Sequence, residues 1–129
     1  MSESSTDSLR NLYEAFGRGD MDVVLAFLQD TEWVEAEGAP WGGVYNGSEA
    51  ILNGVFGPIM QDLQDFKVTP HEILAVDGDR VLGIGNYTGH GPGGALNARF
   101  AHVWTVRDGR ATHFEQFADT ALLQQAVSE

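Results

Sequence analysis

Three residues of this chain are suited to acid/base catalysis. Asp119 follows a strand-like segment, and a carboxylate at the edge of a pocket can act as a general acid or base. Arg99 could orient that carboxylate or an anionic ligand, and Tyr13 could donate a phenolic hydrogen bond to a ligand oxygen. Asp119, Arg99 and Tyr13 are therefore the predicted catalytic residues.

Each of the three also has an ordinary structural interpretation, which the sequence leaves open. Asp119 stands directly before a helical pattern, where aspartate commonly caps a helix N-terminus. Tyr13 lies among apolar residues at helical spacing, so its ring could simply fill the core. Arg99 could be a solvated cation near the end of a strand. The position of each side chain relative to a cavity decides between the two interpretations.

Aromatic residues in and near a glycine-rich segment indicate the walls of a ligand pocket. Trp41 and Tyr45 fall within the glycine-rich residues 38–47, and aromatic side chains in such loops often line a pocket mouth. Plain packing is the alternative for both. The predicted ligand-binding set comprises five wall residues and one amide that meets ligand oxygens: Trp33, Trp41, Tyr45, Val103, Phe114 and Gln116.

No cofactor or metal site is predicted. The chain has no cysteine, which excludes thiolate metal sites and a cysteine nucleophile. Residues 89–94 match the G-x-G-x-x-G pattern, but they join two strand-like segments, whereas the dinucleotide motif leads from a strand into a helix. His102, His113 and Glu115 could together bind a metal ion. A structural pair between His102 and Glu115 on neighbouring strands is the favoured interpretation, and it would stabilise protonated His102.

The acidic composition narrows the choice of partners. The formal net charge is −12, from 19 acidic and 7 basic residues, and such a chain is repelled by nucleic-acid phosphates and by anionic membranes. No apolar run reaches the roughly 18 residues of a membrane span, and the first residues do not resemble a signal peptide. We therefore expect one cytoplasmic domain over residues 1–129, with residues 1–6 as a frayed tail and with neither nucleic-acid nor membrane partners.

Apolar periodicity places helices in the first half of the chain and strands in the second. The first helix presents an apolar face that includes Leu9 and Tyr13, with Asp7 as its N-cap, and the second helix begins near Asp20. A strand over residues 32–37 and a loop over residues 38–47 follow. The later elements are a third helix opened by a capping box of Asn46 and Glu49, strands over residues 66–76, 80–88, 95–107 and 110–118, and a helix over residues 120–127. The order α-α-β-α-β-β-β-β-α predicts an α+β fold whose curved sheet, mixed or antiparallel, wraps around the N-terminal helices.

The last two strands carry large apolar side chains on both faces. Asp108-Gly109 predicts a two-residue type I′ turn, from which the register follows by counting outward. His102 then lies opposite Glu115 on one face, and Val103 lies opposite Phe114 on the other. An antiparallel sheet with one wet face would alternate apolar and polar residues, so one face is expected to cover the pocket and the other to meet a second subunit. The sequence therefore predicts a homodimer.

Three stretches resemble ketosteroid isomerase-related, SnoaL-like proteins of the NTF2-like superfamily. They are YEAFGRGDMDVVLAFLQDTEWVEAEG (residues 13–38), GVYNGSEAI (residues 43–51) and FAHVWTVRDGRATHFEQFADTALL (residues 100–123). The resemblance covers nearly the whole chain and implies a cone-shaped fold with a pocket. It names no reaction, because the superfamily hosts isomerases, cyclases, epoxide hydrolases, dehydratases and non-enzymatic binding domains.

The resemblance does not extend to the catalytic set of the steroid isomerases, which use a tyrosine of the first helix and two aspartates. Aligning their Gly-Asp before the second helix with Gly19-Asp20 places Leu12, Ala36 and Ala101 at those positions. The neighbours of these three residues in the sequence include Tyr13, Glu35, Glu37 and His102. Steroid isomerase activity is therefore not expected.

The resemblance to the cyclases supports Asp119 instead. SnoaL-like cyclases often carry an aspartate ten residues after the turn glycine, and Asp119 has this spacing from Gly109. We therefore expect a cofactor-independent isomerase, cyclase or hydrolase that acts by acid/base catalysis on a small hydrophobic ligand in an enclosed apolar pocket. The alternative is a non-catalytic module that binds a small ligand or another protein.

Overall fold

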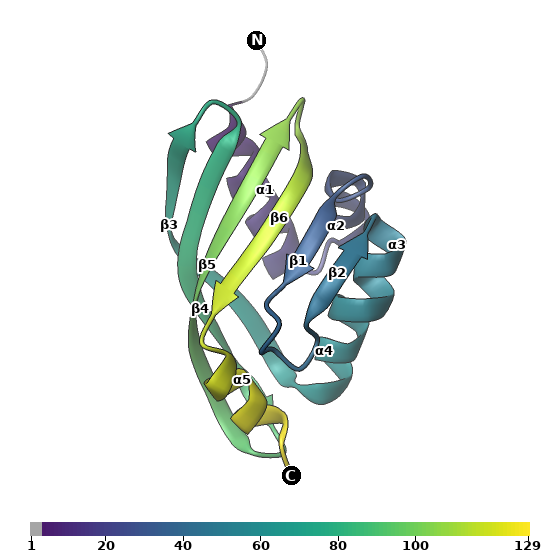
Figure 1. Ribbon diagram of the computed structural model, residues 1–129, viewed down its shortest axis with the longest axis vertical. Coiled ribbons are helices and arrows are strands. Elements are labelled where there is room, and N and C mark those ends of the chain that lie inside the picture. The colour runs from purple at the N-terminus through teal and green to yellow at the C-terminus, as the bar shows by residue number, and fades with distance from the viewer. Residues whose placement is uncertain (1–3) are drawn as a thin grey trace.

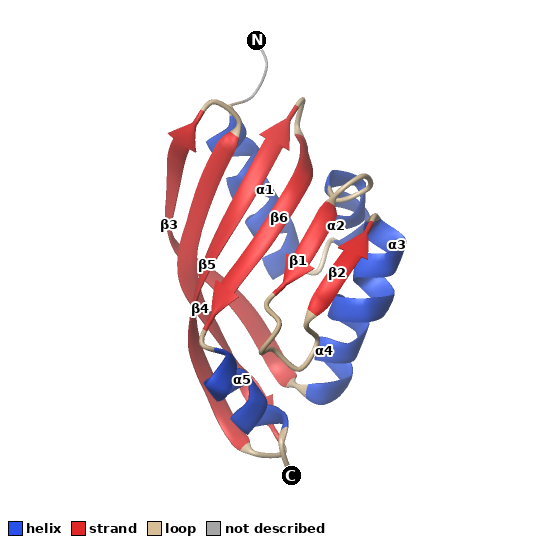
Figure 2. Ribbon diagram, viewed as in Figure 1, coloured by secondary structure: helices blue, strands red, loops and turns tan. Residues whose placement is uncertain are grey.

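The computed structural model describes residues 4–129, in which most helices precede a run of four long strands and one helix follows it (Figure 2). The helices are α1 (Ser5–Gly17), α2 (Met21–Phe27), α3 (Ser48–Ile51), a π-helical turn (Leu52–Phe56), α4 (Gly57–Asp62) and α5 (Thr120–Val127). The strands are β1 (Glu32–Glu35), β2 (Gly43–Asn46), β3 (Gln64–Asp77), β4 (Arg80–Gly91), β5 (Gly94–Arg107) and β6 (Arg110–Ala118).

One curved sheet covers the helices (Figure 1). Within residues 4–129 its strand order is β2-β1-β6-β5-β4-β3, with β1 parallel to β6 and the other neighbours antiparallel. The α+β fold with a curved mixed sheet, predicted from the sequence, is confirmed. None of the helices in this part of the chain is long and apolar enough to cross a membrane.

The first helix starts at Ser5, so the predicted frayed tail is wrong for residues 4–6, and residues 1–3 of that tail lie outside the described residues. Leu9, Leu12 and Tyr13 are buried on its inner face. Its N-cap is Ser4, whose hydroxyl oxygen accepts a hydrogen bond from the backbone N–H of Asp7 at 3.1 Å. The prediction that Asp7 is the cap is therefore wrong, because Asp7 lies within the first turn, where its negative charge still suits the helix N-terminus.

A short strand was missed in the segment predicted as loop. Residues 43–46 form β2, which pairs with β1 and places Val44 opposite Val34. The strand is four residues long and has glycine at its start and directly after it, so its pattern resembles a loop. The predicted capping box of Asn46 and Glu49 is also wrong, because Asn46 ends β2 and Gly47, with φ of 86°, is the N-cap of α3.

The hairpin of β5 and β6 has the predicted turn but a different register. Asp108 and Gly109 both have positive φ, 52° and 75°, as a type I′ turn requires. The pairing then shifts between Val106↔Ala111 and Thr105↔His113, which leaves Thr112 as an extra residue. Such a bulge reverses the faces of all later residues on that strand relative to simple counting.

The bulge changes which side chains of β5 share a face with Phe114 and Gln116 of β6. His102 lies opposite Gln116 and Trp104 opposite Phe114, and all four side chains are buried. The predicted pair of His102 with Glu115 is therefore wrong.

Glycines on β4 make room for side chains of the core. A Cβ added at Gly83 would lie 2.6 Å from the Tyr13 hydroxyl oxygen, and one added at Gly85 would lie 2.9 Å from the Phe100 ring. Both distances are too short for a real contact, so these positions need glycine. Gly83 therefore allows the hydroxyl of Tyr13 to reach the sheet.

Candidate functional site

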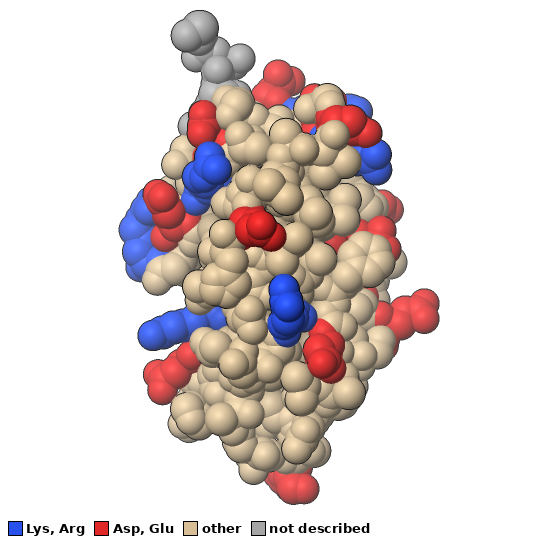
Figure 3. Space-filling model, turned by 90° about the vertical axis from the view of Figure 1, so that its left-hand side faces the viewer, with Lys and Arg blue, Asp and Glu red and all other residues tan. Residues whose placement is uncertain are grey.

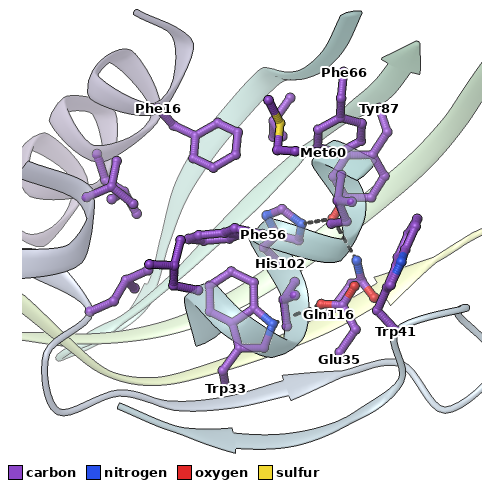
Figure 4. Close-up of a pocket in the computed structure, with 18 of the residues that line it drawn as sticks. Phe16, Trp33, Glu35, Trp41, Phe56, Met60, Phe66, Tyr87, His102 and Gln116 are labelled. Atoms are coloured by element: carbon purple, nitrogen blue, oxygen red, sulfur yellow. Dashed lines mark hydrogen bonds between the residues drawn. The ribbon is translucent and has the colours of Figure 1, made fainter. Parts of the chain in front are cut away.

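A cavity of about 410 Å³ lies between the sheet and the helices (Figure 4). This volume is within the range of small-molecule sites, and the lining is mostly apolar, as such sites usually are. Phe16, Phe56 and Met60 contribute to the helical side of the wall. Apart from the tryptophans, five polar side chains line the cavity: Tyr13, Glu35, Tyr87, His102 and Gln116.

Four of the predicted site residues line this cavity: Tyr13, Trp33, Trp41 and Gln116. Trp41 is held from both sides of its loop. Its indole N–H donates to Asp62 at 3.0 Å, and its backbone carbonyl accepts from the Tyr45 hydroxyl at 2.8 Å. Tyr45 thus supports the wall without belonging to it, which corrects its predicted role.

Two further predicted wall residues also lie outside the lining. Phe114 is fully buried behind Trp33, with the two ring centroids 3.7 Å apart. Val103 faces Glu115 on the opposite side of the sheet from the cavity. The error for Val103 follows from the bulge at Thr112, which simple counting of the register does not include, whereas Phe114 faces inward as predicted but is covered by Trp33.

The structure places Asp119 and Arg99 outside the cavity as well. The Asp119 carboxylate accepts a hydrogen bond from the backbone N–H of Leu122 at 3.2 Å, so the interpretation of Asp119 as the N-cap of α5 is confirmed. The Arg99 side chain is exposed, and its backbone carbonyl accepts the Asp119 N–H at 3.1 Å. The expectation that these two residues share the cavity with Tyr13 is wrong, because the helix N-terminus holds the carboxylate.

Glu35 contributes a buried carboxyl group to the cavity, and it was not among the predicted site residues. Its side chain is 2% exposed, and its Oε1 accepts the Trp33 indole N–H at 2.8 Å. Burial raises the pKa of Glu35 to about 7, although the Trp33 indole and the Gln116 amide oppose this shift. At neutral pH the group therefore exists in both protonation states, as a general acid or base requires.

A second set of polar side chains is centred on His102. Its Nδ1 lies 2.7 Å from the Tyr13 hydroxyl, and its Nε2 is hydrogen-bonded to the Tyr87 hydroxyl. The Trp104 indole donates to the Tyr13 oxygen at 3.1 Å, and the Gln116 amide donates to the Tyr87 oxygen at 2.8 Å. These contacts join β4, β5 and β6 to α1 through side chains, and Figure 4 shows the part formed by His102, Tyr87 and Gln116.

Gln116 links the two sets. Its side-chain oxygen accepts the backbone N–H of Ala36 at 3.1 Å, which directs its NH₂ group toward Tyr87. The same amide lowers the pKa of Glu35, so it lies close to both groups. Gln116 therefore lies between Glu35 and the hydrogen-bonded series of Tyr13, His102 and Tyr87.

His102 is neutral in this setting. Burial lowers its pKa to about 3, and its hydrogen-bond partners are two phenols, without a carboxylate to stabilise a charge. The predicted protonated His102 is therefore wrong. Burial also raises the pKa of Tyr13 and of Tyr87 well above the usual value.

The metal site considered from the sequence does not form. His113 lies at the surface, with its Nδ1 2.9 Å from a Glu32 carboxylate oxygen, whereas His102 is in the interior. In residues 4–129 no group of three His, Asp or Glu side chains is arranged to hold a metal ion. The lining residues in that range also include no lysine or arginine.

Comparison with known proteins identifies the family. No curated protein matches the sequence. The model of the SnoaL-like domain matches residues 9–114. This chain belongs to the SnoaL-like family. The match contains Tyr13, Glu35, Tyr87 and His102, so most of the polar side chains of the cavity lie within the SnoaL-like domain as the family defines it.

Solved structures place this SnoaL-like chain in the NTF2-like superfamily. An NTF2-like protein from Burkholderia thailandensis is 31% identical, with a TM-score of 0.91 over 98% of this chain and 99% of the other. TerC, crystallised with polyporic acid, is 27% identical, with a TM-score of 0.85 over 98% and 100%. A SnoaL-like polyketide cyclase from Shewanella denitrificans shares the fold at 14% identity, with a TM-score of 0.76 over 95% of both chains.

Proposed function

We propose that this SnoaL-like protein catalyses proton transfer on a small hydrophobic molecule without a cofactor, with Glu35 as the acid/base. The observation that carries the proposal is a buried carboxyl group, held by Trp33, in an apolar cavity that raises its pKa to about 7. Perturbed carboxyl groups in clefts are typical of functional sites. Glu35 takes the role that the sequence analysis gave to Asp119.

The chemistry follows from the two protonation states of Glu35. As a carboxylate it accepts a proton from a ligand C–H next to a carbonyl, whose electron pair moves toward the carbonyl oxygen. As a carboxylic acid it returns that proton to another atom of the ligand. Isomerisation and ring closure both need such a transfer and are redox-neutral. The apolar walls exclude water and so strengthen the charge interactions inside.

The relatives support a hydrophobic ligand. TerC was crystallised with polyporic acid, and the more distant Shewanella protein is described as a polyketide cyclase. A first panel of candidate substrates therefore contains apolar aromatic ketones. Binding of members of this panel can be measured before any turnover is known.

Replacing Glu35 with glutamine tests the catalytic role once a substrate is found. The expected result is a loss of turnover of about 100-fold or more, because general acid/base catalysis contributes roughly 10²–10⁴-fold. Wild-type turnover should also change with pH near 7, where Glu35 titrates. The matched control is Glu37→Gln, since Glu37 is exposed on the same segment. A Glu35→Gln variant that turns over at the wild-type rate would support a non-catalytic binding module.

We also propose that the outer face of the sheet forms the predicted homodimer. Phe117, opposite Ala101 on this face, is 52% exposed, and Leu74, opposite Leu82, is 46% exposed. On the side of the molecule shown in Figure 3, charged side chains are scattered with broad uncharged areas between them.

Light scattering on the eluting protein measures the oligomeric state. The expected mass is twice the 14.0 kDa of one chain, and Phe117→Asp is expected to reduce it to that of a monomer. Val23→Asp is the control, because Val23 is also exposed, at 44%, but lies on α2, away from the outer face of the sheet. A wild-type protein that elutes as a monomer would refute the dimer.

A further inference from the structure

The hydrogen-bonded series of Tyr13, His102 and Tyr87 carries one more O–H or N–H hydrogen than its hydrogen bonds use. Two hydroxyls and one neutral imidazole supply three hydrogens, and the two hydrogen bonds to His102 use two of them. Trp104 and Gln116 are donors to the tyrosine oxygens, so neither accepts the third hydrogen. One tyrosine hydroxyl hydrogen therefore has no acceptor among the hydrogen bonds of residues 4–129.

The tautomer of His102 decides which tyrosine carries this spare hydrogen. With the hydrogen on Nδ1, His102 donates to Tyr13, Tyr87 donates to Nε2, and the spare hydrogen is on Tyr13. With the hydrogen on Nε2, His102 donates to Tyr87, Tyr13 donates to Nδ1, and the spare hydrogen is on Tyr87. A buried hydroxyl hydrogen without an acceptor costs free energy, so the site favours a ligand that supplies one.

The surroundings of the two hydroxyls favour the form with hydrogen on Nε2. The Tyr13 oxygen lies against Gly83, where even an added Cβ would be 2.6 Å away. The Tyr87 hydroxyl instead lies beside Gln116, and Figure 4 shows Tyr87, Gln116 and Glu35 following one another along one side of the cavity. Negative charge on Glu35 attracts the hydrogen end of a nearby hydroxyl, which places the spare hydrogen on Tyr87.

We propose that the Tyr87 hydroxyl donates a hydrogen bond to an oxygen of the ligand, and that His102 positions this hydroxyl by donating to it from Nε2. This inference rests on the proposed function and specifies it, because the ligand oxygen then lies beside Glu35, which takes a proton from the adjacent carbon. Electron density gained by that oxygen strengthens its hydrogen bond to Tyr87 during the reaction.

The same geometry defines the class of ligand as a neutral apolar carbonyl compound. The described lining residues include no lysine or arginine, so a carboxylate or phosphate would be buried without a countercharge. Glu35 would repel such an anion at the position of the ligand oxygen. A ketone oxygen accepts the hydrogen of Tyr87 without bringing a charge, and its hydrocarbon part contacts Trp33, Phe56 and the other apolar walls.

The tautomer of His102 can be measured without a ligand. In protein labelled with ¹⁵N-histidine, long-range ¹H–¹⁵N correlations at pH 7 distinguish the two neutral forms from the cation, and His102→Gln assigns the signal. The expected result is a neutral ring with hydrogen on Nε2. A ring with hydrogen on Nδ1, or a charged ring, would overturn the proposal.

The donor role of Tyr87 is tested with 2-acetylnaphthalene and 2-isopropenylnaphthalene, which differ in a carbonyl oxygen replaced by CH₂. The ratio of their dissociation constants is measured by calorimetry for the wild type, Tyr87→Phe and Tyr45→Phe. One hydrogen bond is worth about 0.5–1.5 kcal/mol, so the preference for the ketone should fall roughly 3–10-fold in Tyr87→Phe. The ratio in Tyr45→Phe should equal that of the wild type, because the Tyr45 hydroxyl donates to the Trp41 carbonyl and lies outside the cavity lining.

The infrared band of the bound ketone gives a second reading of the same contact. It should lie at lower frequency in the wild type than in Tyr87→Phe, because a donated hydrogen bond weakens the carbonyl bond. Equal ratios and equal bands in the two proteins would overturn the inference while leaving Glu35 as the acid/base. Failure of both naphthalenes to bind would overturn the assignment of neutral carbonyl ligands. If ketone binding depends on Tyr87 but Glu35→Gln turns over at the wild-type rate, the proposed function is refuted and the inference about Tyr87 stands.

Discussion

Replacing Glu35 with glutamine is expected to raise the free energy of unfolding at pH 8 by on the order of 3 kcal/mol relative to the wild type, with little change at pH 4. Burial raises the pKa of Glu35 from its usual value of 4.5 to about 7 in the folded protein. Between these values the folded state holds a proton that the unfolded state has lost. Stability therefore falls as pH rises through this window, and glutamine, which has no proton to lose, avoids that loss.

Urea unfolding at several pH values between 4 and 8 measures this effect as a difference between variant and wild type. The difference is needed because the chain has 19 acidic residues, which add their own pH dependence to both proteins. Glu37→Gln is the matched control, since Glu37 is an exposed carboxyl group two residues further along the chain. A Glu35→Gln variant with the same pH profile as the wild type would contradict a raised pKa and weaken the catalytic assignment.

The helices were predicted more accurately than the faces of the strands, and the reason is physical. An amphipathic helix repeats its apolar face every few residues, so the burial of Leu9, Leu12 and Tyr13 could be inferred without knowing the rest of the fold. A strand alternates with a period of two, so one extra residue exchanges its faces. Thr112 is such a residue, and no turn or glycine signal marks it in the sequence.

The site was predicted in part for the same reason. Trp33 was predicted as a wall, and Glu35 lies two residues further along the same strand, so its orientation toward the cavity could have been inferred from the strand period. The register for His102 depended on the bulge, and its burial could not be derived by counting. For Asp119 the spacing fits both a helix cap and a pocket carboxylate, and the three-dimensional position of the α5 N-terminus decides between them.

Comparison with the steroid isomerase pattern shows how much one residue matters. The alignment placed Leu12, Ala36 and Ala101 at the three catalytic positions. In the structure Leu12 lines the cavity as an apolar residue, and the polar side chains of Tyr13, Glu35 and His102, each one residue away from an aligned position, reach it as well. A one-residue difference is small in sequence, but on β1 and β5 it moves a side chain from one face of the sheet to the other. The chain therefore has a tyrosine, a carboxyl group and an imidazole at the cavity, although the alignment indicated none.

Acid is expected to destabilise the protein through His102. Burial lowers the pKa of this residue from 6.5 to about 3, so below pH 6.5 the unfolded state binds a proton that the folded state excludes. The stability that neutral His102 provides is complete above pH 6.5 and decreases as pH falls toward 3. Between pH 7 and pH 4 the decrease should be on the order of 3 kcal/mol, and a variant without the imidazole should not show it.

In the wild type the titration of Glu35 offsets the acid sensitivity due to His102, because the two residues change stability in opposite directions over nearly the same pH range. As pH falls from 7 to 4.5, the protein regains the stability that a buried carboxylate costs, while His102 loses stability. The wild-type profile between pH 7 and pH 4.5 should therefore be flatter than either contribution alone. Glu35→Gln should expose the acid sensitivity of His102, and the double variant Glu35→Gln with His102→Gln should remove it.

The double variant also separates titration from packing. His102→Gln removes hydrogen bonds to two buried tyrosines, so it should be less stable than the wild type at pH 7 by about 1–3 kcal/mol. That loss is independent of pH, whereas the titration effect grows below pH 6.5, so the two are distinguished by slope. His90→Gln, at an exposed position of the β4–β5 hairpin, is the matched control for replacing an imidazole. If Glu35→Gln and the double variant lose stability equally on acidification, His102 titrates like an exposed histidine, and its hydrogen bonds to Tyr13 and Tyr87 cannot be those of a buried neutral ring.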